Sequence, residues 1–213
     1  MARLAAFVLA LLVTACVPSE PASEDAKSSV SNSESGDASS DAAQTDQKAA
    51  NTFIAYPDRA GPFTIGTAYT DVAAAHDLSL QYSSEVEDWD NPQATGKGCE
   101  NFGVADKWPV SSLMFEDGIL TRVDFYTPQP DEPKSEKEVM TEKNIGLGSP
   151  VADALVAYGA SLKQAPHPYL EDAGSYLSWS AGDHGIVFET DTKVITSFRI
   201  GTSNSVQYIE GCL

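Results

Sequence analysis

Three cysteines and three histidines give this 213-residue chain its most versatile chemistry. A thiolate beside an imidazole can act as a nucleophile, clusters of both can hold zinc, and two thiols can form a disulfide. The histidines, His76, His167 and His184, are scattered and lack the paired spacing of metal ligands. The sequence around His167 predicts a rigid loop, and that around His184 predicts a turn. We therefore expect no metal site and no cofactor.

The first cysteine ends the segment MARLAAFVLALLVTAC. Arg3 precedes an apolar run from Leu4 to Val13, and small residues lead into Cys16, which is the pattern of a signal peptide. The run is shorter than the 20 or so apolar residues that span a bilayer. The stretch from Val13 to Cys16 also resembles the bacterial lipobox, in which the signal is cut before the cysteine and its thiol is acylated. The resemblance implies a lipoprotein, with Cys16 as the lipidated residue carrying palmitate or a similar chain.

The following residues predict a tether. Residues 17–50 are rich in Ser, Ala, Asp and Glu and lack aromatic side chains, so they bury too little apolar area to fold. A flexible coil of this length spans roughly 30 Å. Val17, rather than an aspartate, follows Cys16. By the lipoprotein sorting rule that the resemblance brings with it, this favours the outer membrane, facing the periplasm.

We expect four regions along the chain: a signal peptide at 1–15, the lipidated cysteine and disordered linker at 16–50, and two repeats at 51–130 and 131–213. The formal net charge of −18 argues against a nucleic-acid partner, because such surfaces need clustered Lys and Arg. It also argues against direct attraction to anionic lipids. The membrane is expected to be contacted through the N-terminal lipid.

The repeat rests on two segments that align without gaps at an offset of 82 residues, 65–81 and 147–163. Each starts with Gly and a hydroxyl residue (Thr67, Ser149), which predicts an N-cap, and continues into an alanine-rich stretch that favours a helix. In the second segment Pro150 is expected at the first helical position.

A hairpin pattern follows each expected helix. Residues 113–125 alternate around Asp117-Gly118, and residues 186–200 alternate around a longer turn at 190–193. The expected fold is therefore α+β, with two tandem helix-plus-antiparallel-sheet repeats after the signal peptide and disordered linker. Two unrelated α+β halves are the alternative to a true duplication.

The stretch from Leu147 to Gly159 resembles a family of small bacterial envelope proteins. Its members include SmpA/OmlA-type lipoproteins of the β-barrel assembly machinery and the β-lactamase inhibitory protein, which carries two such units. The first copy departs from the pattern, because Asp77 stands where the closing glycine is expected. The ending from Tyr208 to Cys212 is similar to that of uncharacterised proteobacterial envelope proteins. These likenesses bear on fold more than on function.

With Cys16 assigned to the lipid, Cys99 and Cys212 remain. In an oxidising compartment an even remainder predicts a disulfide, which here would lock a final strand at 206–209 against the first half of the domain. The alternative is a nucleophilic Cys99 paired with His167 or His184, although no cysteine-hydrolase signature surrounds it.

Further enzymatic signals are weak. The chain has no nucleophile elbow, P-loop or dinucleotide fingerprint. Aromatic residues in loops remain as candidate binding anchors, with core packing as the alternative role. The candidate binding surface comprises Trp89, Trp108, His167, Tyr169, Tyr176 and Trp179.

The leading hypothesis is thus a lipid-anchored cell-envelope protein whose folded part is a non-enzymatic binding module for an envelope protein or glycan. A periplasmic hydrolase inhibitor, by analogy with the β-lactamase inhibitory protein, is the alternative. An envelope enzyme comes third.

Overall fold

The computed structural model describes residues 52–88, 90, 92–105, 108–127 and 138–212. The predicted signal peptide, the predicted lipidation site Cys16, the predicted linker and Trp89 lie outside the described residues.

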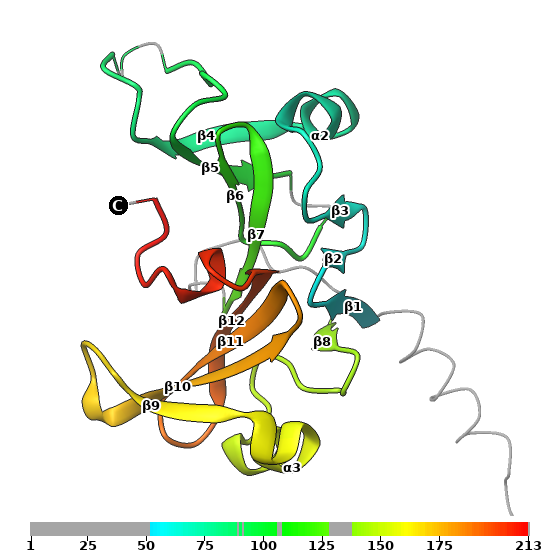
Figure 1. The fold of residues 1–213 in the computed structure, drawn as a ribbon, viewed down its shortest axis with the longest axis vertical. Helices are drawn as coiled ribbons and strands as arrows, with labels where there is room; N and C mark the ends of the chain where they lie inside the picture. Colours follow the sequence, from blue (N-terminus) through cyan, green and yellow to red (C-terminus); the bar gives the residue numbers. More distant parts are fainter. Residues whose placement is uncertain (1–51, 89, 91, 106–107, 128–137, 213) are drawn as a thin grey trace, which may run out of the picture. The chain divides into compact units, whose positions relative to one another are not determined.

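An antiparallel sheet of eight strands dominates the described part of the chain (Figure 1). β7 and β12 pair at its centre, so strands from both halves of the sequence form one continuous sheet. In spatial order its strands are β4 (Leu78–Ser83), β5 (Cys99–Val104), β6 (Ser112–Glu116), β7 (Ile119–Tyr126), β12 (Ile195–Thr202), β11 (His184–Thr190), β10 (Glu171–Ala181) and β9 (Lys163–His167).

A smaller sheet has four strands in the order β3 (Phe63–Thr64), β2 (Arg59–Ala60), β1 (Thr52–Tyr56) and β8 (Glu138–Thr141). β1 pairs in parallel with β8, which comes more than 80 residues later in the sequence. The α-helices of the described ranges are α2 (Tyr69–Ala75) and α3 (Val151–Tyr158), and their 3-10 turns are η1 (Gly159–Ser161) and η2 (Ser205–Gln207).

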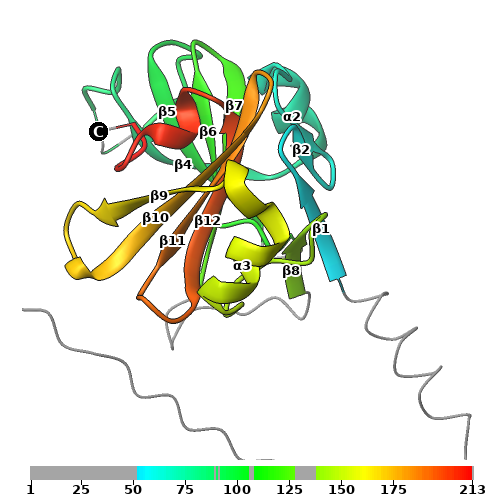
Figure 2. The ribbon, with the colours of Figure 1, turned by 60° about the horizontal axis from the view of Figure 1, so that its bottom comes forward.

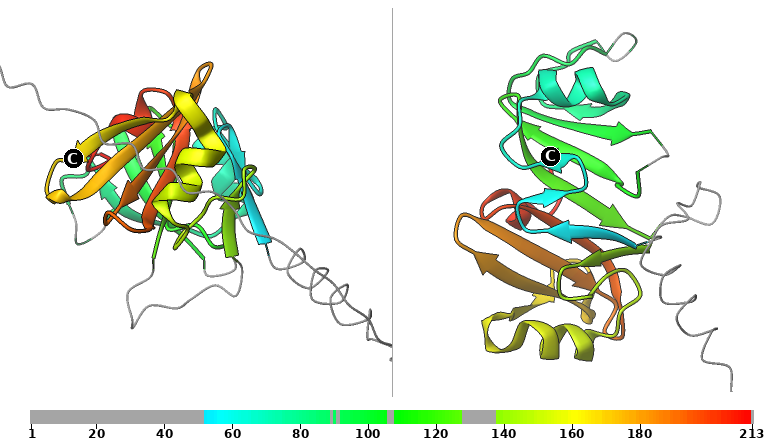
Figure 3. Two further views of the ribbon diagram at one scale, coloured as in Figure 1. Left: turned by 90° about the horizontal axis from the view of Figure 1, so that it is seen from below. Right: turned by 90° about the vertical axis from the view of Figure 1, so that its right-hand side faces the viewer.

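The hydrophobic core lies on one face of the large sheet, under the small sheet and the two helices (Figures 2 and 3). Alternate residues of the central strands point into it, and the rings of Phe125 and Phe198 stack there at 4.6 Å between centroids. Phe53 of β1 and Tyr158 of α3 close the core from the other side. The opposite face of the large sheet carries no α-helix among the described residues, only the 3-10 turn η2 and the segment that follows it, and we call it the open face.

The expected α+β fold with two tandem helix-plus-antiparallel-sheet repeats is wrong. Of the described residues, 49% are in strands and 14% in helices, and only two short α-helices occur among them. The alanine-rich segments form two turns of helix each, and then give way to strands β4 and β9. Alternating Leu78, Leu80 and Tyr82 explain β4, because a period of two fits a strand better than a helix.

Of the predicted local features, the hairpins are present, whereas the helix caps and the final strand are not. Both hairpins are confirmed, and Asp117 and Gly118 take the positive φ angles, 49° and 75°, that a tight hairpin turn requires. The predicted caps are wrong. The N-cap positions are Ala68 and Pro150, and neither helix has a side-chain cap. The expected strand at 206–209 is also wrong, because its first residues belong to η2.

No helix in the described ranges is long and apolar enough to cross a membrane.

Candidate functional site

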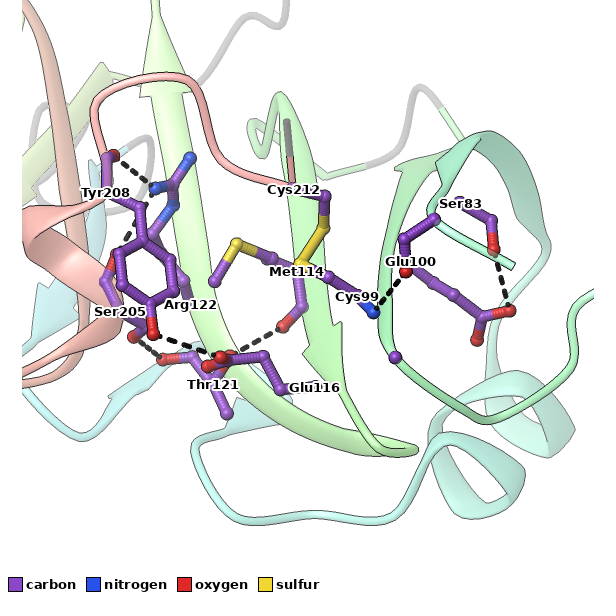
Figure 4. The surroundings of a disulfide bond; sticks show 12 residues. Ser83, Cys99, Glu100, Met114, Glu116, Thr121, Arg122, Ser205, Tyr208 and Cys212 are labelled. Carbon is purple, nitrogen blue, oxygen red and sulfur yellow. Dashed lines mark hydrogen bonds between the residues drawn. A yellow bond between two sulfur atoms is a disulfide. The ribbon is translucent and has the colours of Figure 1, made fainter. Parts of the chain in front are cut away.

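The C-terminal segment, residues 203–212, leaves β12 and returns across the open face of the large sheet (Figure 4). Ser205 anchors its start by donating its hydroxyl to the backbone oxygen of Thr121, at 2.6 Å. Backbone carbonyls of the C-terminal segment face two arginines that project from the central strands. Arg199 Nε donates to the oxygen of Val206 at 2.6 Å, and Arg122 Nη1 donates to the oxygen of Tyr208 at 2.8 Å.

Both arginines are buried and paired with carboxylates on the same face. Arg122 is 6% exposed, and its Nε lies 3.0 Å from a carboxylate oxygen of Asp124. Arg199 is 4% exposed, binds Glu189, and lies 5.2 Å from the ring centroid of Tyr176. Each guanidinium therefore joins a carboxylate of the sheet to the backbone of the segment, and these charge-assisted hydrogen bonds offset part of the cost of burying the charge.

A disulfide fixes the far end of the segment. Cys212 is bonded to Cys99 at the start of β5, with 5.2 Å between their Cα atoms and 113 residues between them in sequence. The disulfide predicted from the sequence is therefore confirmed. In this state the sulfur of Cys99 is bonded to another sulfur, so it presents no thiolate for nucleophilic attack.

The loop that carries Cys99 is held by a buried carboxylate. Glu100 is 1% exposed and accepts hydrogen bonds from the backbone N–H groups of Thr95, at 2.7 Å, and Gly96, at 3.1 Å. Gly98 has a φ of 58°, and a Cβ there would lie 2.5 Å from the hydroxyl of Ser84. The Gly-Lys-Gly-Cys-Glu sequence thus positions the cysteine through a turn that glycine permits and a carboxylate that secures it.

Between the segment and the sheet lies an open pocket of about 530 Å³, which we call the tail pocket. This volume falls in the range of small-ligand sites. It is lined by Cys99, Glu116, Tyr169, Gln207, Tyr208, Ile209, Glu210, Gly211 and Cys212.

Two tyrosine–glutamate pairs mark the tail pocket. The hydroxyl of Tyr208 donates to Glu116 at 3.2 Å, and that of Tyr169 donates to Glu210. The negative charge of Glu116 raises the pKa of Tyr208, and the hydrogen bond to Glu210 raises the pKa of Tyr169. Both phenols therefore remain protonated donors at neutral pH, and both carboxylates are oriented by them.

The structure separates the candidate aromatic residues into two groups. Trp108 and Trp179 pack against the core. Trp108 contacts the ring of Phe63, and Trp179 contacts that of Tyr158, at 5.8 and 5.3 Å between centroids. His167, Tyr169 and Tyr176 lie together instead, as described next.

These three residues form a cluster at the β9–β10 edge of the sheet. The ring of His167 is 4.7 Å from that of Tyr176 and 6.0 Å from that of Tyr169. His167 Nε2 lies 3.9 Å from Glu189 Oε2, and its Nδ1 accepts a hydrogen bond from the Tyr169 N–H at 3.1 Å. Burial is the main reason that the pKa of Tyr176 is raised.

The two histidines considered as alternative partners of Cys99 lie apart from each other. His167 lies beside Glu189 near one end of β11, whereas His184 begins β11 at its other end, paired with Thr202. Among the residues that the structure describes, no group of three or more His, Cys, Asp or Glu side chains is arranged to hold a metal ion.

Sequence reasoning missed several residues of this site, including Glu116, Arg122, Arg199 and Glu210. The signal for Arg122 and Arg199 was available, because both stand within apolar strands of the predicted hairpins. No local sequence pattern indicated Glu116 or Glu210, because only the return of the C-terminal segment over the sheet brings both into one pocket.

Comparison with known proteins identified no relative of this chain. A scan against protein-family models, a search of curated proteins and a search of solved structures each found no significant match.

Proposed function

We propose that this is a lipid-anchored cell-envelope protein whose folded part binds another macromolecule, without catalysis, at the tail pocket on the open face. The observation that carries the binding role is the exposure of large side chains around this pocket. Tyr169 is 62% exposed, Tyr208 40% and Ile209 42%, and all three line the pocket.

Exposed aromatic and aliphatic side chains around a concavity are typical of an interaction site, because burial against a partner removes their apolar area from water. Here the surface is also preorganised. The disulfide and the arginine-to-carbonyl hydrogen bonds hold its backbone, so little conformational entropy is lost on binding.

The proposed anchor rests on the sequence. The lipobox-like Cys16 and the acidic spacer support attachment to the outer membrane with the folded part in the periplasm. The same compartment is oxidising, which fits a disulfide.

Site-specific photo-cross-linking in living cells tests the binding role. Benzoylphenylalanine at Ile209, in the tail pocket, is expected to give a discrete adduct. Val156, which is 84% exposed on α3, provides the matched control position and is expected to give none. No adduct from Ile209, or the same adducts from both positions, would contradict the proposal. An adduct that contains an envelope hydrolase would favour the inhibitor hypothesis within it.

A further inference from the structure

Resting on the proposed function, we infer that the tail pocket accepts a basic side chain, lysine or arginine, presented by a polypeptide partner.

Two carboxylates contribute charge from different parts of the fold. Glu116 ends β6, and Glu210 belongs to the C-terminal segment. Among the described residues that line the tail pocket, none is a lysine or an arginine. Arg122 lies nearby, but its guanidinium is buried and engaged by Asp124 and by the carbonyls of the segment. The negative charge of the pocket is therefore not neutralised by its own lining.

The phenol hydroxyls leave each carboxylate with acceptor capacity. An ionised carboxylate has about four lone-pair sites. Tyr208 occupies one on Glu116, and Tyr169 occupies one on Glu210. Guanidinium or ammonium donors can use the others, and the tyrosine rings add favourable cation–π contacts.

The rim specifies a polypeptide rather than a free cation. Ile209, which is exposed in the pocket lining, offers an apolar contact that a small inorganic cation cannot use. The aliphatic stem of lysine or arginine packs on such surfaces while its charged end reaches a carboxylate. A cavity of about 530 Å³ also has room for a side chain with its neighbours. The whole chain, with its net charge of −18, attracts a basic partner at long range.

Fluorescence polarisation with two peptides tests this inference on the full chain, purified in non-ionic detergent. One probe is a fluorescein-labelled nonapeptide with arginines between leucines, and the other is its twin with citrulline, which keeps the shape and lacks the charge. The arginine peptide is expected to bind at least about tenfold more tightly at low salt, and to weaken as salt screens the charges.

Three variants locate the binding. Glu116→Gln and Glu210→Gln are each expected to weaken the arginine peptide about fivefold. Glu142→Gln removes the same charge from an exposed position outside the pocket lining and is expected to change nothing. The citrulline comparison uses the unaltered protein, so it remains decisive if a variant folds poorly.

The inference is overturned if the two peptides bind equally, if neither binds, or if Glu142→Gln weakens binding as much as Glu116→Gln. If this happens while Ile209 still forms its specific adduct, the charge preference fails and the binding role stands. Loss of the Ile209 adduct would instead remove the binding role itself.

Discussion

Removing the disulfide is expected to destabilise the protein strongly and to release only the end of the C-terminal segment. The change is the double substitution Cys99→Ser with Cys212→Ser. The bridge closes a loop with a sequence separation of 113 residues. In the chain-entropy model a cross-link of this span is worth about 4.8 kcal/mol at 25 °C.

That value is large beside the usual free energy of unfolding of about 5–15 kcal/mol. We therefore expect a loss of about 3–5 kcal/mol in denaturant unfolding followed by tryptophan fluorescence. Unaltered protein treated with a reductant should unfold at the same denaturant concentration as the double variant, which separates the bridge from the effect of serine.

Hydrogen exchange read by mass spectrometry tests the local part of the prediction. Residues 205–208 remain held by Arg122 and Arg199 and should stay protected. Residues 209–212 depend on the bridge and should exchange faster. A loss of less than about 1 kcal/mol, or equal deprotection of both stretches, would refute the reasoning, because the bridge would then be neither a major constraint nor a local one.

Three further results are expected. Arg199→Met should cost about 3 kcal/mol in denaturant unfolding, because Glu189 loses its partner, and adding Glu189→Gln should recover part of it; full stability of the single variant would contradict this role. Burial raises the pKa of Tyr158, so the unfolded state releases its proton first and stability should fall as pH rises above about 10. Tyr158→Phe should flatten that fall in unfolding curves recorded from pH 8 to 11, and an unchanged slope would assign it to other groups. Mass spectrometry of the mature N-terminus should find acyl chains on Cys16, whereas an unmodified thiol there would exclude the lipoprotein assignment.

The parts of the fold that sequence could predict are local. The Asp117-Gly118 turn is set by two adjacent residues with positive φ, and the alternation of apolar and polar residues on both sides of it predicts the two paired strands. The overall class could not be read in this way. The alanine-rich segments favour helix by propensity, yet the chain around them pairs into sheets whose partners are far apart, such as β1 with β8.

The candidate site shows the same limit. Arg122 and Arg199 occupy positions that alternate with core residues, which predicts a solvent-facing side of the sheet. They are buried because the C-terminal segment folds back over them, and Ser205 of that segment, which contacts Arg122, lies 83 residues further along the chain. Side-chain direction also depends on register shifts, such as the one at Glu189 and Thr190, which no local pattern announces.

The bridge from Cys99 to Cys212 also decides how the folded part would respond to force. Tension applied at Thr52, and resisted by the proposed partner in the tail pocket, would pass from residue 52 to Cys99 and then across the sulfur atoms. Residues 100–211 lie inside the closed covalent loop, so load can reach Ile209 and Glu210 in the pocket through Cys212 and bypass most of the backbone between Cys99 and Gln207. Pulling can therefore extend β1 to β4, while the central strands and the pocket wall keep their covalent connection to the point of attachment.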